Sequence, residues 1–233
     1  EVIAAPAVGI INVHASLLPK YRGAAPVAYA ILNGETRTGV TIIKVTPGLD
    51  SGDMILQEAI DILPDDTTGT LEARLAELGA RLAVDAVRKY AAGGPVDGAK
   101  QDPALVTRAP KIKKEFGLID WSKPAAAVAN HVRAMQPWPT AYTFLHRPGK
   151  EPMRVIVNRV GGDLAGYWLD EFGPGQPGAV ALDGRGNFVV KSADAAVHVL
   201  ELQPAGKKRM PAAEFLRGYP IVPGMRFGPE VLS

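Results

Sequence analysis

The sequence contains no cysteine. This absence excludes a disulfide framework, a thiolate nucleophile and a zinc site built on sulfur, and it fits a reducing compartment such as the cytoplasm. The sequence also lacks any apolar run near the roughly eighteen residues that a membrane-spanning helix needs. Hydrophobic residues make up 47% and charged residues 21% of the 233 residues, which is ordinary for a globular protein. We therefore expect a cytoplasmic protein with a real core and no role in a membrane.

The two halves of the chain differ in charge. Residues 1–100 carry nine basic and twelve acidic residues, net −3, and residues 101–233 carry 17 basic and 12 acidic residues, net +5. Such an asymmetry favours a polyanion as the partner of the basic half. Two domains with unrelated surfaces remain the alternative that composition allows.

The first part of the chain predicts α/β architecture. Residues 9–13 form an apolar run typical of a strand buried on both faces, and residues 38–45 and 54–63 predict two more strands. A short helix is expected at 27–32. A longer helix begins near Gly69, with one core-facing stripe made of Leu71, Leu75, Leu78, Leu82 and Val87.

Two or three strands are too few for an independent open sheet. The chain opens with Glu1 and shows no features of a signal peptide. We therefore expect residues 1–92 to be the later portion of an α/β domain whose first strands lie upstream of this sequence.

The second part of the chain predicts a small β-barrel. Residues 93–116 lack periodicity and are expected to be a linker. A short helix is expected at 122–135. Five short β-prone runs follow in the predicted domain 117–233, at residues 141–145, 153–160, 178–182, 187–191 and 196–202. This succession favours an OB-like barrel, with a sandwich as the alternative.

A candidate reacting centre lies where the first strand ends. Asn12 and His14 are two residues apart, so their side chains point to the same face of a strand. An amide and an imidazole together can stabilise an oxyanion and handle a proton. Asp50 lies in the loop between the next two strands, where a carboxylate could orient the imidazole; Asp53 is the rival that spacing leaves open. Turn or capping roles are the ordinary alternative for all of these residues.

Longer motifs around these residues resemble the folate-dependent formyltransferases. Asn12–Pro26 (NVHASLLPKYRGAAP) and Gly48–Gln57 (GLDSGDMILQ) resemble that family as a whole. Pro110–Ser122, Arg133–Tyr142 and Leu202–Met210 resemble the second domain of its methionyl-tRNA formyltransferases. The resemblance implies a Rossmann-like catalytic domain and a second domain that binds tRNA. It also implies a further mononucleotide-binding half before these residues.

The resemblance further implies the roles of individual residues. Asn12 matches the oxyanion-stabilising asparagine, His14 the catalytic histidine and Asp50 the catalytic aspartate. Residues expected to contact folate are Ser16, Leu17, Leu18 and Pro19 in the first loop and Val45, Thr46 and Gly48 in the second.

The implied reaction moves a formyl group from 10-formyltetrahydrofolate to the amine of initiator methionyl-tRNA, with no metal and by a monomer. Basic clusters beside the predicted barrel are expected to contact tRNA phosphates. Solvated surface patches are the alternative for both clusters. Their members are Lys111, Lys113, Lys114, Lys207, Lys208 and Arg209.

Other functions share the same chemistry. An enzyme that formylates an amino-sugar nucleotide, or the hydrolase-like domain of formyltetrahydrofolate dehydrogenase, would need the same three residue types. A tRNA-binding module without catalysis is the alternative from a different class. Trp121 and Trp138 are expected in the core or between domains, and His131, His146 and His198 in structural roles.

Overall fold

The computed structural model describes residues 3, 6, 9–92, 97–161 and 175–232. The chain divides into two compact units, Glu1–Ile112 and Lys113–Ser233. The predicted linker, 93–116, contains this division, and residues 97–112 of it belong to the first unit. The domain bounds 1–92 and 117–233 stay a prediction.

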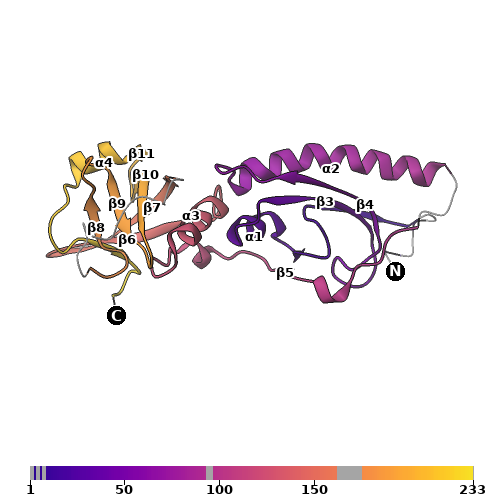
Figure 1. Cartoon of the computed structure of the whole chain (residues 1–233), viewed down its shortest axis with the longest axis horizontal. Helices are drawn as coiled ribbons and strands as arrows, with labels where there is room; N and C mark the ends of the chain where they lie inside the picture. The colour runs from indigo at the N-terminus through magenta and orange to yellow at the C-terminus, as the bar shows by residue number, and fades with distance from the viewer. Residues whose placement is uncertain (1–2, 4–5, 7–8, 93–96, 162–174, 233) are drawn as a thin grey trace. The chain divides into compact units, whose positions relative to one another are not determined.

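The first unit contains a three-stranded antiparallel sheet in the order β1-β3-β4. A long helix, α2, runs along one face of this sheet (Figure 1). A short parallel pair, β2 and β5, lies outside it. The bounds are β1 Ile11–His14, β2 Arg22–Gly23, α1 Pro26–Leu32, β3 Arg37–Lys44, β4 Met54–Asp61, α2 Thr68–Ala91, the 3₁₀ helix η2 Pro103–Leu105 and β5 Arg108–Ala109.

The N-terminus of α2 shows how the sequence specifies this unit. Thr67 accepts a hydrogen bond from the Thr70 amide, and the Thr70 side chain reaches back to the Thr67 amide, so the two residues form a capping box. The apolar stripe then packs against the sheet through Leu71, Leu75, Leu78 and Leu82, which are all buried.

Two details of the predicted packing are wrong. Val87 was expected on the core stripe of α2, but it is 57% exposed, and Ala86 takes the buried position instead. The strand β1 was expected to be buried on both faces, but Val13 is 45% exposed. Among the described residues β1 pairs only with β3, so it lies at the edge of the sheet.

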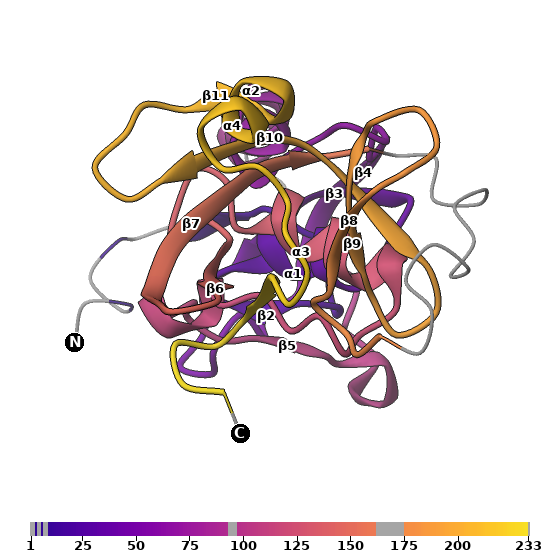
Figure 2. The ribbon, with the colours of Figure 1, turned by 90° about the vertical axis from the view of Figure 1, so that its left-hand side faces the viewer.

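The second unit contains a curled antiparallel sheet of six strands in the order β12-β6-β7-β10-β9-β8, with β11 paired to β10 (Figure 2). A bridge between Ala179 and Arg226 brings the two ends of the sheet together, so the barrel is nearly closed. The bounds are the 3₁₀ helix η3 Lys114–Gly117, α3 Ala125–Ala134, β6 Tyr142–Arg147, β7 Lys150–Val160, β8 Val180–Leu182, β9 Phe188–Lys191, β10 Ala196–Pro204, β11 Met210–Pro211, α4 Ala212–Gly218 and β12 Arg226–Gly228.

Closure of the barrel depends on a close backbone approach at Gly178. Its carbonyl accepts a hydrogen bond from the Phe227 amide at 2.7 Å. A Cβ atom at Gly178 would lie 2.1 Å from the Phe227 carbonyl oxygen, and its φ is +89°, so only glycine fits. The five strands predicted for the second unit and the α/β part before them are confirmed. The second unit is a barrel and not the alternative sandwich.

The core of the barrel is aromatic. Phe188 stacks on Phe215 with ring centroids 5.8 Å apart, and Trp121 stacks on Phe227 at 5.7 Å. Trp121 is 3% exposed, as expected of a core residue, but Trp138 is 57% exposed within its unit. None of the helices among the described residues is long and apolar enough to cross a membrane.

Candidate active site

His14 is held from both sides by two loops of the first unit. Its side chain is 5% exposed. Ring atom Nε2 lies 2.9 Å from the carbonyl oxygen of Tyr21. Because a carbonyl can only accept, Nε2 carries the hydrogen of this bond, and Nδ1 is the ring atom left to gain or lose a proton.

Asp50 faces that free ring atom. Its Oδ2 lies 3.7 Å from Nδ1 of His14 and accepts a hydrogen bond of 2.9 Å from the Gly23 amide. Spacing alone could not choose between Asp50 and Asp53, and the family resemblance favoured Asp50; in the structure the Asp50 carboxylate lies beside the histidine. A carboxylate in this position can orient the imidazole ring.

The backbone next to His14 and at Asp50 adopts positive φ angles. Asp50 has φ +45° and Tyr21 has φ +64°, although neither residue is glycine. Such conformations cost of order 1 kcal/mol each and persist where surrounding contacts impose them. Gly23 has φ +129°, and a Cβ atom there would lie 2.4 Å from the Ala109 carbonyl oxygen. Glycine is therefore required where the backbone amide meets Asp50.

A polar cluster fixes the loop that carries Tyr21. The Tyr21 hydroxyl donates to Glu35 and accepts from Asn33, and Lys20 also donates to Glu35. Burial raises the pKa of Tyr21, and Glu35 adds to this rise against the opposing hydrogen bond from Asn33. Burial alone would raise the pKa of Glu35, but the hydrogen bonds from Lys20 and Tyr21 lower it overall. The phenol thus stays a neutral donor to a charged acceptor.

Asn12 and Asp50 line the same cavity. This cavity has a volume of about 530 Å³ and is bordered by β1, β3 and the loop between β3 and β4. Among the described residues the Asn12 side chain makes no hydrogen bond, so its amide is free to donate. Three of the residues expected to contact folate also line the cavity: Val45, Thr46 and Gly48.

The other four residues expected to contact folate do not line that cavity. Ser16 is fully buried and donates to the Lys20 carbonyl at 2.7 Å, and Leu18 is 3% exposed. Thr41 donates to the Ser16 carbonyl and accepts from the Leu18 amide. Ser16 and Leu18 therefore shape the loop, whereas Leu17 and Pro19 are only partly buried.

A partly buried hydrogen-bond network that the sequence did not suggest holds the backbone of Asp50. Gln101 donates to the carbonyl oxygens of Asp50 and Gly52 and accepts from Arg22. No sequence pattern pointed to it, because Gln101 lies 51 residues from Asp50 along the chain.

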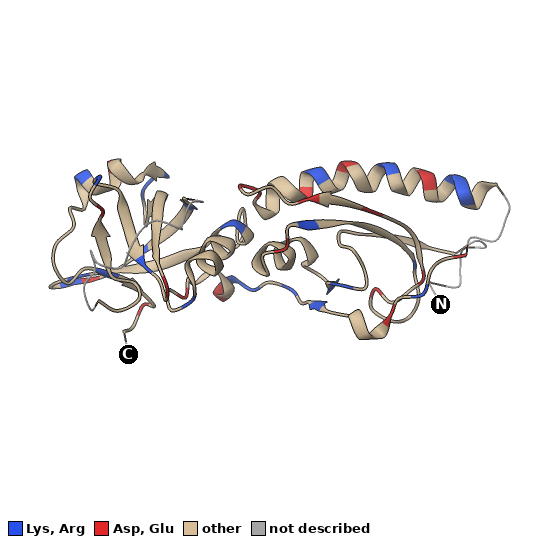
Figure 3. Cartoon of the chain, in the orientation of Figure 1, with Lys and Arg blue, Asp and Glu red and all other residues tan. Residues whose placement is uncertain are grey.

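The residues expected to contact tRNA are exposed. Figure 3 marks the lysines and arginines along the ribbon in blue. Lys207 and Lys208 are exposed in the turn between β10 and β11, and Lys111, Lys113 and Lys114 are exposed beside η3. Arg209 instead forms an ion pair with Glu201, which also binds Arg159.

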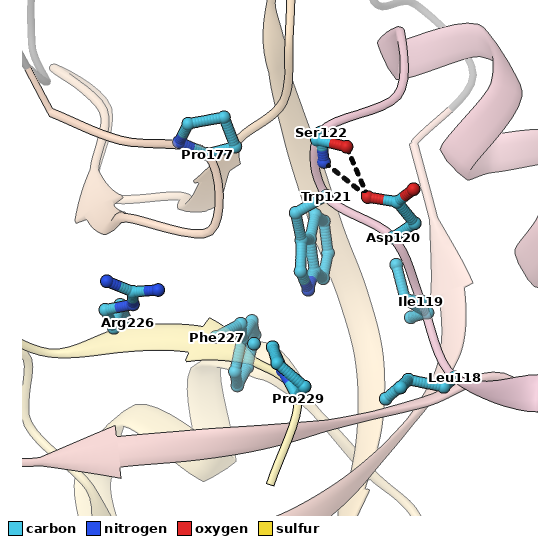
Figure 4. Close-up of a pocket in the computed structure, with 10 residues that line it drawn as sticks. Leu118, Ile119, Asp120, Trp121, Ser122, Pro177, Arg226, Phe227 and Pro229 are labelled. Atoms are coloured by element: carbon cyan, nitrogen blue, oxygen red, sulfur yellow. Dashed lines mark hydrogen bonds between the residues drawn. The ribbon is translucent and has the colours of Figure 1, made fainter. Parts of the chain in front are cut away.

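A second cavity, of about 300 Å³, lies in the barrel unit (Figure 4). Trp121, Pro177, Arg226 and Phe227 line it, and none of the predicted site residues does. At its border Ser122 donates to Asp120, and this hydrogen bond lowers the pKa of Asp120. In the described part of the chain no cluster of three or more His, Asp or Glu side chains could hold a metal ion.

Comparison with known proteins identifies the class. The model of the formyl transferase family matches residues 1–87, and the model of the formyl transferase C-terminal domain matches residues 111–220. The chain belongs to the formyl transferase family. It spans about two thirds of the length of the curated relatives that it matches.

The similar curated proteins are methionyl-tRNA formyltransferases. The chain is 44% identical over 228 residues to a methionyl-tRNA formyltransferase of Moorella thermoacetica, covering 98% of this chain and 70% of the relative. The same identity and length of match hold for a methionyl-tRNA formyltransferase of Citrifermentans bemidjiense, covering 98% and 67%.

Solved structures show the same fold at low identity. HypX from Aquifex aeolicus in complex with tetrahydrofolic acid is similar with a TM-score of 0.59 at 19% identity, over 88% of this chain and 34% of that one. An N-formyltransferase from Helicobacter canadensis, solved with folinic acid and dTDP-3-aminofucose, is similar with a TM-score of 0.59 at 20% identity, over 82% and 65%.

Proposed function

We propose that this protein transfers a formyl group from 10-formyltetrahydrofolate to the amino group of methionyl-initiator-tRNA, for translation initiation. The observation that carries the proposal is the convergence of three side chains: Asn12 and Asp50 border one cavity, and His14 lies 3.7 Å from the Asp50 carboxylate. The names of the relatives favour tRNA as the acceptor over a sugar nucleotide.

In the proposed reaction Asn12 and His14 stabilise the oxyanion. The attacking amine forms a bond to the formyl carbon, the bond from that carbon to N10 of the folate breaks, and one proton passes from the amine to N10. The Asn12 amide is free to donate to the carbonyl oxygen as it becomes negative. Nδ1 of protonated His14 is a second donor, because Nε2 is already bound to Tyr21. One such donor contributes roughly 3 kcal/mol to transition-state stabilisation.

Asp50 acts through His14 and through its own position at the cavity. Its carboxylate lies 3.7 Å from Nδ1 of His14, which is longer than a hydrogen bond. A water molecule or the substrate amine could therefore bridge the two groups and carry the proton. No covalent intermediate with the enzyme and no metal is required.

The proposed folate contacts are Val45, Thr46 and Gly48 at the cavity, with Leu17 and Pro19 from the neighbouring loop. Ser16 and Leu18 support that loop from inside. The cavity's apolar lining from Ile10, Ile11 and Ile43 suits a planar heterocycle, which buries apolar surface on binding.

The proposed tRNA contacts are the exposed lysines, because a phosphate needs an accessible cation. Lys207 and Lys208 form one cluster and Lys111, Lys113 and Lys114 the other. Arg209 is a weaker candidate, since its guanidinium is paired with Glu201. We place the reaction in the cytoplasm and expect a monomer.

In the decisive experiment the whole encoded protein is given 10-formyltetrahydrofolate with methionyl-initiator-tRNA, with a dTDP-amino sugar, or with no acceptor. We expect formylation of methionyl-initiator-tRNA and none of a dTDP-amino sugar. Formyl release to water without an acceptor would favour the hydrolase alternative. Binding of initiator tRNA without transfer, unchanged by His14→Ala, would favour the non-catalytic module and overturn the proposal.

A further inference from the structure

Gln101 lies at the centre of the contacts that hold Asp50. Its Nε2 donates to the carbonyl oxygen of Asp50 at 2.7 Å and to that of Gly52 at 2.8 Å. Its Oε1 accepts from Arg22 Nε at 3.0 Å and from Arg22 Nη2 at 2.7 Å. All the hydrogens of one amide nitrogen are thereby used, and the oxygen is held by two donors.

The backbone brings Gln101 to this place by a short antiparallel bridge. Met54 and Ala99 exchange two backbone hydrogen bonds, of 2.8 and 2.9 Å. The segment that begins at Gly98 therefore runs beside the start of β4 and points Gln101 back along the loop between β3 and β4.

Gln101 also connects the two loops that clamp His14. Arg22 stands between Tyr21, whose carbonyl accepts from His14, and Gly23, whose amide donates to Asp50. The same guanidinium binds Gln101, which binds the Asp50 backbone. One loop thus fixes the ring and the other fixes the carboxylate, and Gln101 with Arg22 sets the distance between the loops.

We infer that Gln101 is a positioning residue for the formyl transfer: it holds the Asp50 backbone at positive φ so that the carboxylate faces His14. This inference rests on the proposed function for its catalytic consequence, but the positioning itself can be measured without any substrate.

The side-chain chemistry restricts this role to glutamine. Glutamate has the same size and would still pair with Arg22, but its carboxylate oxygens would face the carbonyl oxygens of Asp50 and Gly52, and none of these groups can donate. Asparagine is one methylene shorter. Gln101→Glu therefore separates donation to the Asp50 loop from acceptance of Arg22.

The substrate-free test follows the amide hydrogen of Gly23, which donates to the Asp50 carboxylate. Amide exchange is measured in the whole encoded protein and in its Gln101→Glu and Gln101→Ala variants. We expect protection of the Gly23 amide to fall about tenfold in both variants, while the amides of the β3–β4 ladder keep theirs. Unchanged protection at Gly23 overturns the inference.

The catalytic test separates kcat from KM. A displaced carboxylate costs roughly ten- to a hundredfold in kcat, because geometry at the reacting centre controls the rate. The KM values for folate and tRNA should stay within about twofold, since Gln101 does not line the cavity. A rise in KM with kcat unchanged contradicts a positioning role.

Arg74→Ala is the matched control for lost stability. Arg74 binds the Asp66 side chain and the Asp61 carbonyl in the same unit, away from Asp50. We expect it to lower the melting temperature without changing kcat or Gly23 exchange at 25 °C. If Arg74→Ala reproduces the Gln101→Ala effects, the role of Gln101 is structural only. If the parent protein formylates nothing, the proposed function fails, while the Gly23 exchange still decides the role of Gln101.

Discussion

The two units are stabilised in different ways. All six phenylalanines and all three tryptophans of the sequence lie after residue 112. The first unit packs aliphatic residues such as Ile42 and Leu75 between its sheet and α2, and its proposed catalytic residues are held by polar contacts between loops. The barrel of the second unit closes around stacked aromatic rings. Reactivity and stability should therefore respond to substitutions in different places.

The largest expected effect tests the chemistry of the first unit. We expect His14→Ala to lower kcat/KM for formyl transfer by about a thousandfold, because it removes both a proton carrier and an oxyanion donor. Affinity for initiator tRNA should not change, since the basic clusters are left intact. Single-turnover rates and filter binding measure the two quantities. Retention of a tenth or more of the activity would contradict the role of His14 as both proton carrier and oxyanion donor.

The next effect tests the stability of the second unit. Phe227 is 1% exposed and touches the rings of both Trp121 and Phe188. We expect Phe227→Ala to lower the free energy of unfolding by about 3 kcal/mol, because it leaves a cavity among stacked rings. Urea denaturation gives this value. The matched control is Phe116→Ala, since Phe116 is 46% exposed and should cost less.

A large loss of kcat in the folded Phe227→Ala variant at 25 °C would contradict the view that the first unit supplies reactivity and the aromatic core of the second unit supplies stability. We expect kcat of the folded variant to stay within a few fold of the parent value.

The sequence predicted regular elements better than contacts between distant loops. The ranges expected for α1, β3 and β4 agree with the structure within two residues, because apolar periodicity and breakers such as Asn33-Gly34 act locally. Strand alternation likewise placed Asn12 and His14 on one face. Short elements such as β12 and α4 carry too few residues for a periodic signal, and both were missed.

The exposure of individual side chains and the contacts between residues far apart in the sequence became visible only in the folded structure. Val87 lies five residues after Leu82 and so falls off the face of α2 that the leucines share, whereas Ala86, four residues after Leu82, takes the buried position. Trp138 was expected in the core or between domains, but its side chain is 57% exposed within its unit. The contact of Gln101 with Asp50 depends on the Met54–Ala99 bridge, which no local pattern encodes.

A smaller effect tests binding by the second unit. We expect Lys207→Ala with Lys208→Ala to weaken initiator tRNA binding about tenfold at low salt and to leave kcat unchanged, because both lysines are exposed and should contact phosphates. The slope of log affinity against log salt should also become shallower, by roughly one for each lysine that no longer pairs with a phosphate. Binding titrations at several salt concentrations measure this.

Arg209→Ala is the control for the two lysine substitutions. Because Arg209 is paired with Glu201, its removal should change tRNA affinity less than either lysine does. An Arg209 effect larger than that of the two lysines would mean that tRNA displaces Glu201, and the lysine clusters would lose their assigned role.

The smallest effect concerns pH and the barrel unit. Burial lowers the pKa of His131, although the Gly117 carbonyl and Asp120 partly oppose this shift. The unfolded chain therefore binds a proton more readily than the folded one. The stability that neutral His131 contributes is complete above about pH 6.5, the value for an unfolded histidine, and it falls as the pH falls towards the folded pKa.

His131→Gln keeps a donor for the Gly117 carbonyl but cannot titrate. We expect the loss of unfolding free energy between pH 8 and pH 5 to be smaller in this variant, by under about 1 kcal/mol. Urea denaturation at both pH values measures it, and the first unit should keep its parental pH dependence when it is followed through amide exchange in β3. An equal or larger loss in the variant would mean that His131 is protonated in the folded barrel, so that its buried position does not favour the neutral ring.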